Sequence, residues 1–229
     1  MAFILIIASL VLFLWIVSLC KVLLLPRIPF AKHFTNNNGR AFRKRNVLLV
    51  IAHPDDESMF FTPTINFLTS KGHNVQILCL SIGDADGKGN IRKQELFQAC
   101  VALKVPMQQV KIVNHPDLQD GFGKVWNHSL LAKIIEEEIT SRCIDMIITF
   151  DSYGVSGHCN HRDVHYGVCK LLHDILQRDI EVWELCLVNE HSRRSGIAMA
   201  QHSSQWVWFR KLFVTLSSYT YMNTLRKVK

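Results

Sequence analysis

Apolar and polar positions alternate along this chain in blocks that predict alternating strands and helices. Short runs of mostly branched apolar residues are typical of strands buried on both faces of a parallel sheet. Segments with the spacing of amphipathic helices lie between these runs. The alternation predicts an α/β fold, a Rossmann-like and mostly parallel sheet flanked by helices, with right-handed crossovers. The expected strands are 47–52, 74–80, 110–113 and 144–150, and the expected helices are 58–70, 91–103 and 126–141.

The first 25 residues differ from this pattern. Residues 2–20 are apolar apart from Ser9 and Ser18 and carry no charge. At about 1.5 Å per residue, a helix of this length spans most of the hydrocarbon core of a bilayer. A cleaved signal peptide is the alternative, but the basic start and a clear small-residue cleavage site are missing. We therefore predict a transmembrane anchor at 1–25, a basic juxtamembrane linker at 26–45 and one globular domain at 46–229.

Positive charge is concentrated behind the apolar segment. The formal net charge is +7; no basic residue precedes the segment, and Lys21, Arg27 and Lys32 follow it. Because positive charge stays on the cytoplasmic side of a membrane, the globular domain is expected to face the cytosol. No recognised nucleic-acid-binding motif accompanies the charge, so we expect contact with anionic lipid head groups and no nucleic-acid partner.

The cysteines agree with a cytosolic domain. Their number is seven, which is odd, and no C-x-x-C pair occurs. Cys79, Cys100 and Cys143 lie on apolar stretches and are expected to be reduced core residues.

The strand expected at 47–52 runs directly into a His-Pro-Asp-Asp-Glu sequence at 53–57. Three adjacent carboxylates repel one another, and at the end of a buried strand they require a nearby cation or a proton. The simpler interpretation is an acidic first turn of a helix. A second histidine cluster far along the chain favours a metal site instead.

That second cluster follows the strand expected at 144–150. His158 and His161 are three residues apart, and Gly154 and Gly157 allow the loop to bend closely around a ligand. Alone, such a pair is typical of two exposed histidines at a helix start. Open α/β sheets bind ligands at the carboxyl ends of their strands, so two clusters at two strand ends predict a shared site.

Together the clusters contain the donors of a catalytic metal centre. His53, Asp56 and His161 make a set of two histidines and one carboxylate with an open position, as catalytic zinc requires. The same set suits Fe²⁺, so ligand type alone does not fix the metal. Asp55 is then placed to accept a proton from water. His158 can donate to a developing oxyanion or to a leaving group, which completes the requirements of metal-assisted hydrolysis.

Both motifs resemble one known family. Ala-His-Pro-Asp-Asp-Glu at 52–57 and Gly-His-Cys-Asn-His at 157–161 are similar to motifs of the zinc-dependent de-N-acetylases of N-acetylglucosamine conjugates. The likeness covers 46–177 and resumes at 205–211. The resemblance implies that the metal ligands of Zn²⁺ are His53, Asp56 and His161, that Asp55 is the general base, that His158 is the electrophilic histidine and that Arg92 contacts the substrate.

The resemblance also implies a substrate and a location. Membrane-anchored members act on N-acetylglucosaminyl-phosphatidylinositol, a lipid-linked sugar, early in glycosylphosphatidylinositol (GPI) anchor synthesis. With the predicted anchor, this implies a single-pass protein of the endoplasmic reticulum membrane whose catalytic domain, 46–229, faces the cytosol. A deacetylase of another N-acetylglucosamine conjugate is one alternative. A shortened, catalytically impaired form with a binding role is the other.

The chain departs from the family pattern at several places. Asn160 stands where relatives often carry Asp, so it can orient His158 but would support its protonated form less. The stretch 181–205 is expected to be shorter than in relatives, which leaves the substrate cleft without part of its wall.

A solvated helix charge near Glu95 is the alternative interpretation of Arg92. The aromatic and basic segment 206–221 is expected to be a helix packed on the core, with the membrane interface as the alternative.

Overall fold

The computed structural model describes residues 44–174, 181–188 and 193–227, with positions 9, 12, 13, 15–17 and 20 near the N-terminus. The chain divides into two compact units, Met1–Asn36 and Asn37–Lys229. The anchor predicted at 1–25 and the linker predicted at 26–45 lie mostly outside the described residues and stay predictions. Within the described part of the chain, no helix is both long enough and apolar enough to cross a bilayer.

A six-stranded sheet in the order β3-β2-β1-β4-β5-β6 forms the centre of the second unit. The first five strands are parallel, and β6 pairs with β5 in the antiparallel direction. The chain moves outward from β1 to β3 and then returns to place β4 on the other side of β1. The order of the strands therefore reverses between β1 and β4, and open α/β sheets commonly bind ligands at the carboxyl ends of the strands at such a point. The strands are β1 Asn46–Ile51, β2 Asn74–Cys79, β3 Val110–Ile112, β4 Met146–Thr149, β5 Glu181–Val188 and β6 Met222–Lys227.

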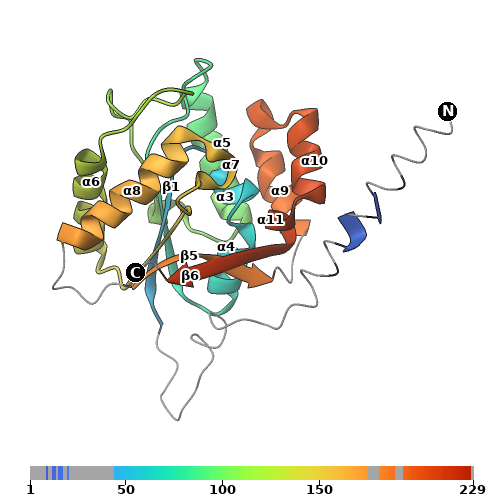
Figure 1. The fold of residues 1–229 in the computed structure, drawn as a ribbon, viewed down its shortest axis with the longest axis horizontal. Helices are drawn as coiled ribbons and strands as arrows, with labels where there is room; N and C mark the ends of the chain where they lie inside the picture. The colour runs from blue at the N-terminus through green and yellow to red at the C-terminus, as the bar shows by residue number, and fades with distance from the viewer. Residues whose placement is uncertain are drawn as a thin grey trace, which may run out of the picture. The chain divides into compact units, whose positions relative to one another are not determined.

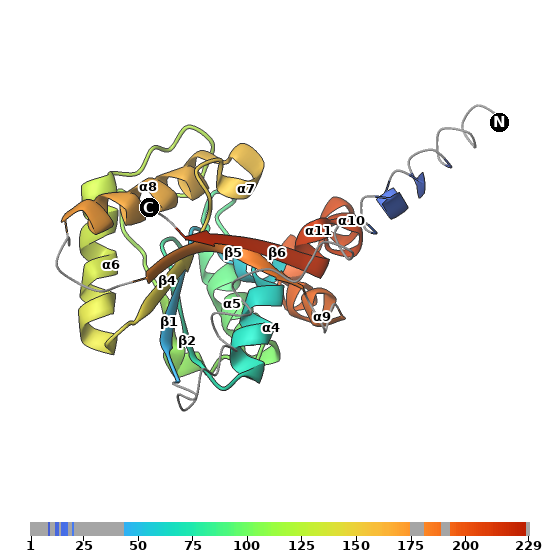
Figure 2. The same cartoon turned by 60° about the horizontal axis from the view of Figure 1, so that its bottom comes forward.

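Helices cover both faces of this sheet (Figures 1 and 2). Helices α6 and α8 pack together on one face, where both contact β1, and α4, α5 and α9 lie on the other face. The helices described are α3 Asp56–Met59, α4 Thr62–Ser70, α5 Gly89–Ala102, α6 His128–Arg142, α7 Gly154–Gly157, α8 Cys159–Asp174, α9 Arg193–Gln201, α10 Trp208–Leu216 and α11 Ser218–Tyr221, with short 3₁₀ turns η1 Met107–Gln109 and η2 Ser203–Gln205.

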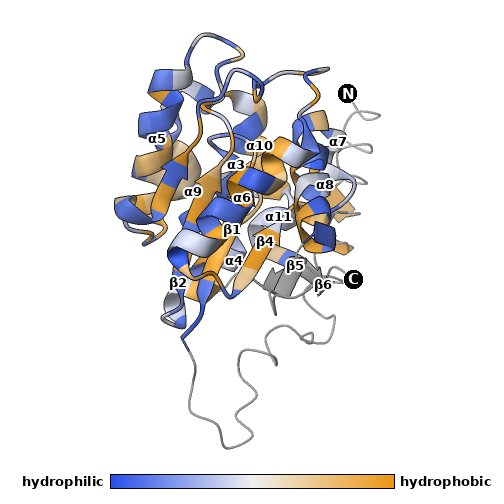
Figure 3. Cartoon of the chain, turned by 90° about the vertical axis from the view of Figure 1, so that its left-hand side faces the viewer, coloured by the Kyte–Doolittle hydropathy of each residue, from blue (hydrophilic) through white to orange (hydrophobic). Residues whose placement is uncertain are grey.

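The core follows the predicted pattern. Strands β1 and β4 are almost wholly buried and hydrophobic apart from one terminal residue each, whereas the helices change between hydrophobic and hydrophilic residues (Figure 3). Cys79 and Cys100 are buried and free, as predicted. Cys143 is exposed, so its expected place in the core is wrong. It ends α6 in a left-handed conformation at a turn facing solvent.

The predicted α/β fold with a mostly parallel sheet is confirmed, and four predicted strands are present. The helix expected at 58–70 is broken into α3 and α4 by a turn at Phe60 and Phe61. The elements that were not predicted include α8, β5, α9 and the antiparallel edge strand β6. Two of them, β5 and α9, fall within 181–205, so the stretch expected to be short still adds a strand to the sheet and a helix to one face.

Candidate active site

The loops after β1 and β4 bring three histidines together. The ring centroids of His53, His158 and His161 lie 5.0 to 5.3 Å apart. One nitrogen of each ring lies within 4.8 Å of a nitrogen of the others. His53 and His161 are buried. The convergence predicted for the two strand ends is therefore present.

Asp56 connects the two clusters. Its Oδ2 accepts the backbone N–H groups of Ala52 and His53, at 3.1 and 2.8 Å. Its Oδ1 lies 3.2 Å from Nε2 of His161. Burial alone would raise the pKa of the Asp56 carboxyl, but His161 and His53 together hold that pKa well below its usual value. Asp56 is therefore an anion inside the site.

The other nitrogen of His161 is occupied by the protein. Its Nδ1 lies 3.1 Å from the carbonyl oxygen of Gly154, and its ring stacks on Phe150 with centroids 4.3 Å apart. Gly154 has φ +70°, and a Cβ there would come within 2.9 Å of the His161 Cβ. Glycine is required for this close approach. The ring is thus held so that Nε2 faces Asp56.

His53 is held in a comparable way. Its Nε2 lies 3.0 Å from Oδ1 of Asp120 and 3.1 Å from Oδ1 of Asn160. Its Nδ1 is left facing Asp56, 3.9 Å from Oδ2. Metal-binding histidines commonly donate their second ring N–H to a carboxylate or carbonyl, which fixes the ring. The side chain of Asn160 therefore contacts His53, whereas Asn160 contacts His158 through its backbone N–H.

These donors fit a divalent metal ion. Two imidazole nitrogens and one carboxylate oxygen, each buried and each oriented by a second hydrogen bond, are typical of catalytic zinc, and the same donors suit Fe²⁺. The predicted set of His53, Asp56 and His161 is one arrangement that the geometry allows. The three histidines are another, because His158 also lies within 4.8 Å of both rings.

The acidic sequence at 53–57 spreads its carboxylates toward different cations. Asp55 has φ +105° and ψ −21°, a conformation that side chains other than glycine rarely adopt and that costs roughly 1–3 kcal/mol. This bend, followed by the start of α3, turns the next side chains apart. Asp56 faces His161, whereas Glu57 faces His202. The repulsion inferred from sequence is thus relieved by separate partners.

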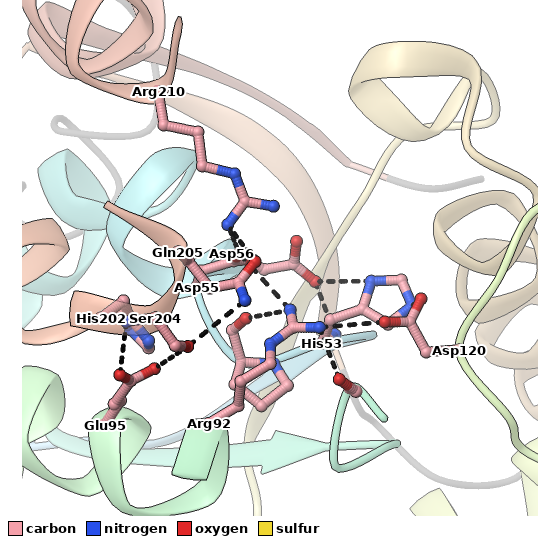
Figure 4. A network of polar contacts seen from close by, with 12 residues as sticks. His53, Asp55, Asp56, Arg92, Glu95, Asp120, His202, Ser204, Gln205 and Arg210 are labelled. Carbon is pink, nitrogen blue, oxygen red and sulfur yellow. Dashed lines mark hydrogen bonds and ion pairs between the residues drawn. The ribbon is translucent and has the colours of Figure 1, made fainter. Parts of the chain in front are cut away.

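Two arginines reach Asp55, as Figure 4 shows. Arg210, from α10, forms an ion pair with Asp55 Oδ2, and Arg92, from α5, lies 3.4 Å from the same oxygen. Burial raises the pKa of the Asp55 carboxyl, although Arg210 and Arg92 oppose part of that rise. A buried carboxylate with a raised pKa is suited to accept a proton.

Arg92 is buried beneath the site. Its Nη1 donates to the carbonyl of Gly83 at 2.6 Å and to Asp120 Oδ2 at 3.0 Å, and its Nη2 donates to the carbonyl of Pro54 at 2.8 Å. The guanidinium therefore ties the loops after β1, β2 and β3 together. The alternative of a solvated helix charge is wrong because the residue is only 6% exposed. Its contact with substrate stays a prediction.

His158 lies at the open side of the histidine cluster. Burial, followed by the nearby His53 and His161, lowers the pKa of His158 to about 4, so the ring is neutral at pH 7. The backbone N–H of Asn160 points at His158 Nδ1 from 3.3 Å. This contact favours the tautomer with its proton on Nε2, which leaves that N–H available as a hydrogen-bond donor.

A polar cleft adjoins the site at Asp120. Its volume is about 340 Å³, enough for a sugar ring with substituents. The loops after β2 and β3 form its walls. Among the lining residues are Ser81, Asp84, Asn114, His115, Gln119, Asp120 and Lys124.

The C-terminal region is joined to the site by a buried ion pair. His202 Nε2 lies 2.6 Å from Glu57 Oε1, and both side chains are fully buried. Burial alone would lower the pKa of His202, but the Glu57 carboxylate and its hydrogen bond raise that pKa above the usual value. Glu57 Oε2 also accepts the backbone N–H of Asp55 at 3.1 Å, so the pair supports the bend at Asp55.

We expect His202→Ala to lower the free energy of unfolding by about 3–5 kcal/mol, because it leaves the Glu57 carboxylate buried without its cation. Denaturant unfolding of the purified chain measures this change, with the exposed His173→Ala as the matched control. Because the pKa of His202 is higher in the folded than in the unfolded chain, where it is near 6.5, the pair contributes its full stability below that pH. This contribution is lost as the pH rises through the folded-state pKa. The wild type should therefore lose stability over that window and His202→Ala should not. An unfolding energy within about 0.5 kcal/mol of the wild type would contradict the role of the pair.

Three site residues were not predicted from sequence, namely Asp120, His202 and Arg210. Asp120 follows a short strand in a polar Pro-Asp-Leu-Gln-Asp-Gly loop, which was the one local signal available. Arg210 lies inside the 205–211 segment where the family resemblance resumes. No local pattern marks His202, whose partner is 145 residues away.

The chain is similar to known proteins in sequence and in fold. The family model described as GlcNAc-PI de-N-acetylase (PIG-L) matches residues 48–172. A Dictyostelium discoideum protein named probable N-acetylglucosaminyl-phosphatidylinositol de-N-acetylase is 31% identical over 86% of this chain and 99% of its own length. The Bos taurus N-acetylglucosaminyl-phosphatidylinositol de-N-acetylase is 32% identical over 78% of this chain and 81% of its own length. The solved N,N'-diacetylchitobiose deacetylase of Pyrococcus horikoshii has the same fold, with a TM-score of 0.66 at 15% identity over 87% of this chain and 91% of that chain.

Proposed function

The chain belongs to the GlcNAc-PI de-N-acetylase family, and from this membership we propose that it hydrolyses the acetamide of N-acetylglucosaminyl-phosphatidylinositol. The products are glucosaminyl-phosphatidylinositol and acetate, and the reaction belongs to GPI-anchor biosynthesis. The proposal is supported by the buried site, in which Asp56 Oδ1 lies 3.2 Å from His161 Nε2. Asp55 and His158 lie next to this pair. A base, a neutral hydrogen-bond donor and a set of metal donors are the groups that amide hydrolysis requires.

The proposed metal ligands are His53, Asp56 and His161. A bound Zn²⁺ ion would polarise the acetamide carbonyl and acidify a water molecule, and Fe²⁺ could serve in the same position. Contacts on the second nitrogen of each ring orient the two histidines: His161 Nδ1 donates to the carbonyl oxygen of Gly154, and His53 Nε2 donates to the side-chain oxygens of Asp120 and Asn160. These contacts keep one nitrogen of each ring directed at Asp56.

Asp55 and His158 have separate roles in the proposed reaction. Asp55 accepts the proton of the attacking water and later returns it to the amine that leaves. Arg210 and Arg92 hold its carboxylate in place and limit how far burial raises its pKa. His158, neutral at pH 7, donates its Nε2–H to the oxygen that becomes negative in the tetrahedral transition state.

The sugar is proposed to enter from the cleft beside Asp120. The polar side chains that line it offer hydrogen-bond partners for hydroxyl groups, and Lys124 offers a positive charge for a phosphate. Arg92 contacts the substrate in this proposal through small rearrangements of its bonds to Asp55 and Asp120. The predicted anchor at 1–25 would keep the protein at the endoplasmic reticulum membrane with its catalytic domain in the cytosol.

Substrate competition tests the proposal against a deacetylase of other conjugates. Purified full chain is given the lipid-linked substrate, N-acetylglucosamine and diacetylchitobiose, and loss of the acetyl group is followed by mass spectrometry. We expect the lipid-linked substrate to be deacetylated and the two soluble sugars to react at least about 100-fold more slowly, since they lack the phosphate and lipid contacts. Equal turnover of a soluble sugar would contradict the proposed substrate. Absence of turnover with an intact metal site would favour the impaired form.

A further inference from the structure

Helix α10 presents an apolar face to solvent. Its inner side packs on the domain through Val214, which is buried, and Phe213, whose ring lies 5.6 Å from Phe60. The packing expected for segment 206–221 is therefore present on this side only. The outer side carries two aromatic and two aliphatic side chains at helical spacing. Their exposed fractions are 73% for Trp208, 54% for Phe209, 50% for Leu212 and 45% for Leu216.

The segment of the chain that carries this face is basic. Lys211 is exposed beside it, with Nζ 5.5 Å from the centre of the Trp206 ring. From residue 191 to residue 229 the sequence contains no Asp or Glu. Basic residues with aromatic and aliphatic neighbours match an anionic surface that has an apolar interior. The basic residues of this region are Arg193, Arg194, Arg210, Lys211, Arg226, Lys227 and Lys229.

The apolar face also borders the candidate active site. Arg210 leaves the same helix toward Asp55 and donates to Gln205 Oε1 at 2.7 Å (Figure 4). At the histidine cluster, Phe122 is 86% exposed and its ring lies 4.6 Å from that of His158. Exposed aromatic side chains thus border the site from α10 and from the loop after β3. Such concentrations of exposed apolar surface mark binding sites.

We infer that α10 is a membrane-contact helix. Its outer face, defined by Trp208, Phe209, Leu212 and Leu216, enters the interface of a bilayer that contains anionic phospholipid. Lys211 lies along the head groups, where a long cationic side chain keeps its charge in water while its stem covers apolar surface. The helix thereby holds the active site against the surface that carries a lipid-linked sugar. This last step rests on the proposed function, whereas the membrane contact does not.

The membrane is favoured over a protein partner by composition. An interface for a protein usually mixes both signs of charge around an apolar centre. Here the segment that carries the apolar face contains basic residues and no acidic ones, and the largest residue of the face is a tryptophan, which prefers the boundary between head groups and acyl chains. An anionic bilayer surface accounts for both the basic charge and the exposed tryptophan.

Quenching by brominated lipids tests the contact without reference to activity. The full chain contains five tryptophans, and Trp15→Phe removes the one within the predicted anchor. This protein is placed in bilayer discs of phosphatidylcholine and phosphatidylserine that contain a brominated lipid. We expect Trp208→Phe to remove most of the remaining quenching and the matched control Trp206→Phe to remove less than half. Equal quenching before and after Trp208→Phe would overturn the inference and leave a protein partner as the use of this face.

Activity on two forms of the substrate tests the consequence. Trp208→Ser/Phe209→Ser should lower turnover of the lipid substrate in anionic vesicles about tenfold, because two apolar contacts with the bilayer are lost. Turnover of the deacylated, soluble head group should be unchanged. Ile91→Ser/Val101→Ser, at two positions of α5 that are each 55% exposed, is the control and should change neither rate. Equal losses on both substrates would overturn the inference, and a wild type that turns over neither would overturn the proposed function while the quenching result still decides the contact.

Discussion

Asp55→Asn is expected to lower kcat for acetate release by about 100- to 10,000-fold, the usual contribution of a general base. The amide of Asn cannot accept the proton of the attacking water, yet it is nearly isosteric with the carboxylate. It can still accept hydrogen bonds from Arg92 and Arg210, so the bend at Asp55 should persist. Steady-state kinetics on the lipid substrate measure the change, and metal analysis of the same preparation shows whether the site is intact.

Asp56→Asn is the matched control for Asp55→Asn. Asp56→Asn removes a proposed metal ligand and should lower the bound metal, whereas Asp55→Asn should keep it. If Asp55→Asn lost the metal and Asp56→Asn retained it, the roles of the two aspartates would be reversed. Near-normal kcat in Asp55→Asn with full metal content would remove Asp55 from the proton transfer.

His158→Ala is expected to lower kcat about 100- to 1,000-fold with little change in substrate affinity. A donor that acts only on the developing oxyanion contributes to the transition state and not to the bound substrate, and its loss typically costs about 3–4 kcal/mol. The kinetics are measured on the lipid substrate, and binding is measured separately on the variant with the same lipid.

Metal content decides between the two arrangements at His158. Its ring lies close enough to His53 and His161 to serve as a third imidazole ligand. If His158→Ala loses the metal as fully as His161→Ala does, His158 is a metal ligand and not a donor to the oxyanion. If it keeps the metal and also keeps near-normal kcat, the proposed donor role of His158 is wrong.

The sequence predicted those parts of the fold that depend on short-range pattern. Strands β1 and β4 consist mostly of consecutive apolar residues because both of their faces are buried, and such runs are visible without any knowledge of their partners. Strand β6 could not be predicted in this way. Its sequence, Met-Asn-Thr-Leu-Arg-Lys, is largely polar and becomes a strand by pairing with β5 at the edge of the sheet.

The residues of the candidate site also differ in whether short-range sequence pattern was enough to predict them. His53, Asp56, His158 and His161 lie in two short motifs, so residue type and spacing were enough to predict their convergence. Arg210 could not be predicted, because its role depends on α10 reaching a carboxylate 155 residues away. Long-range ion pairs leave no periodic signal in a sequence.

Deacetylation of the lipid-linked sugar is expected to depend on the metal, and acetate release with and without a chelator measures this dependence. Purified full chain is treated with a chelator, dialysed and given N-acetylglucosaminyl-phosphatidylinositol with and without added Zn²⁺, while released acetate is quantified. We expect acetate and glucosaminyl-phosphatidylinositol in equal amounts from the untreated protein, almost none after chelation, and recovery when Zn²⁺ is restored, with no recovery in His161→Ala. Acetate release that survives chelation, or that His161→Ala sustains at the wild-type rate, would contradict the account.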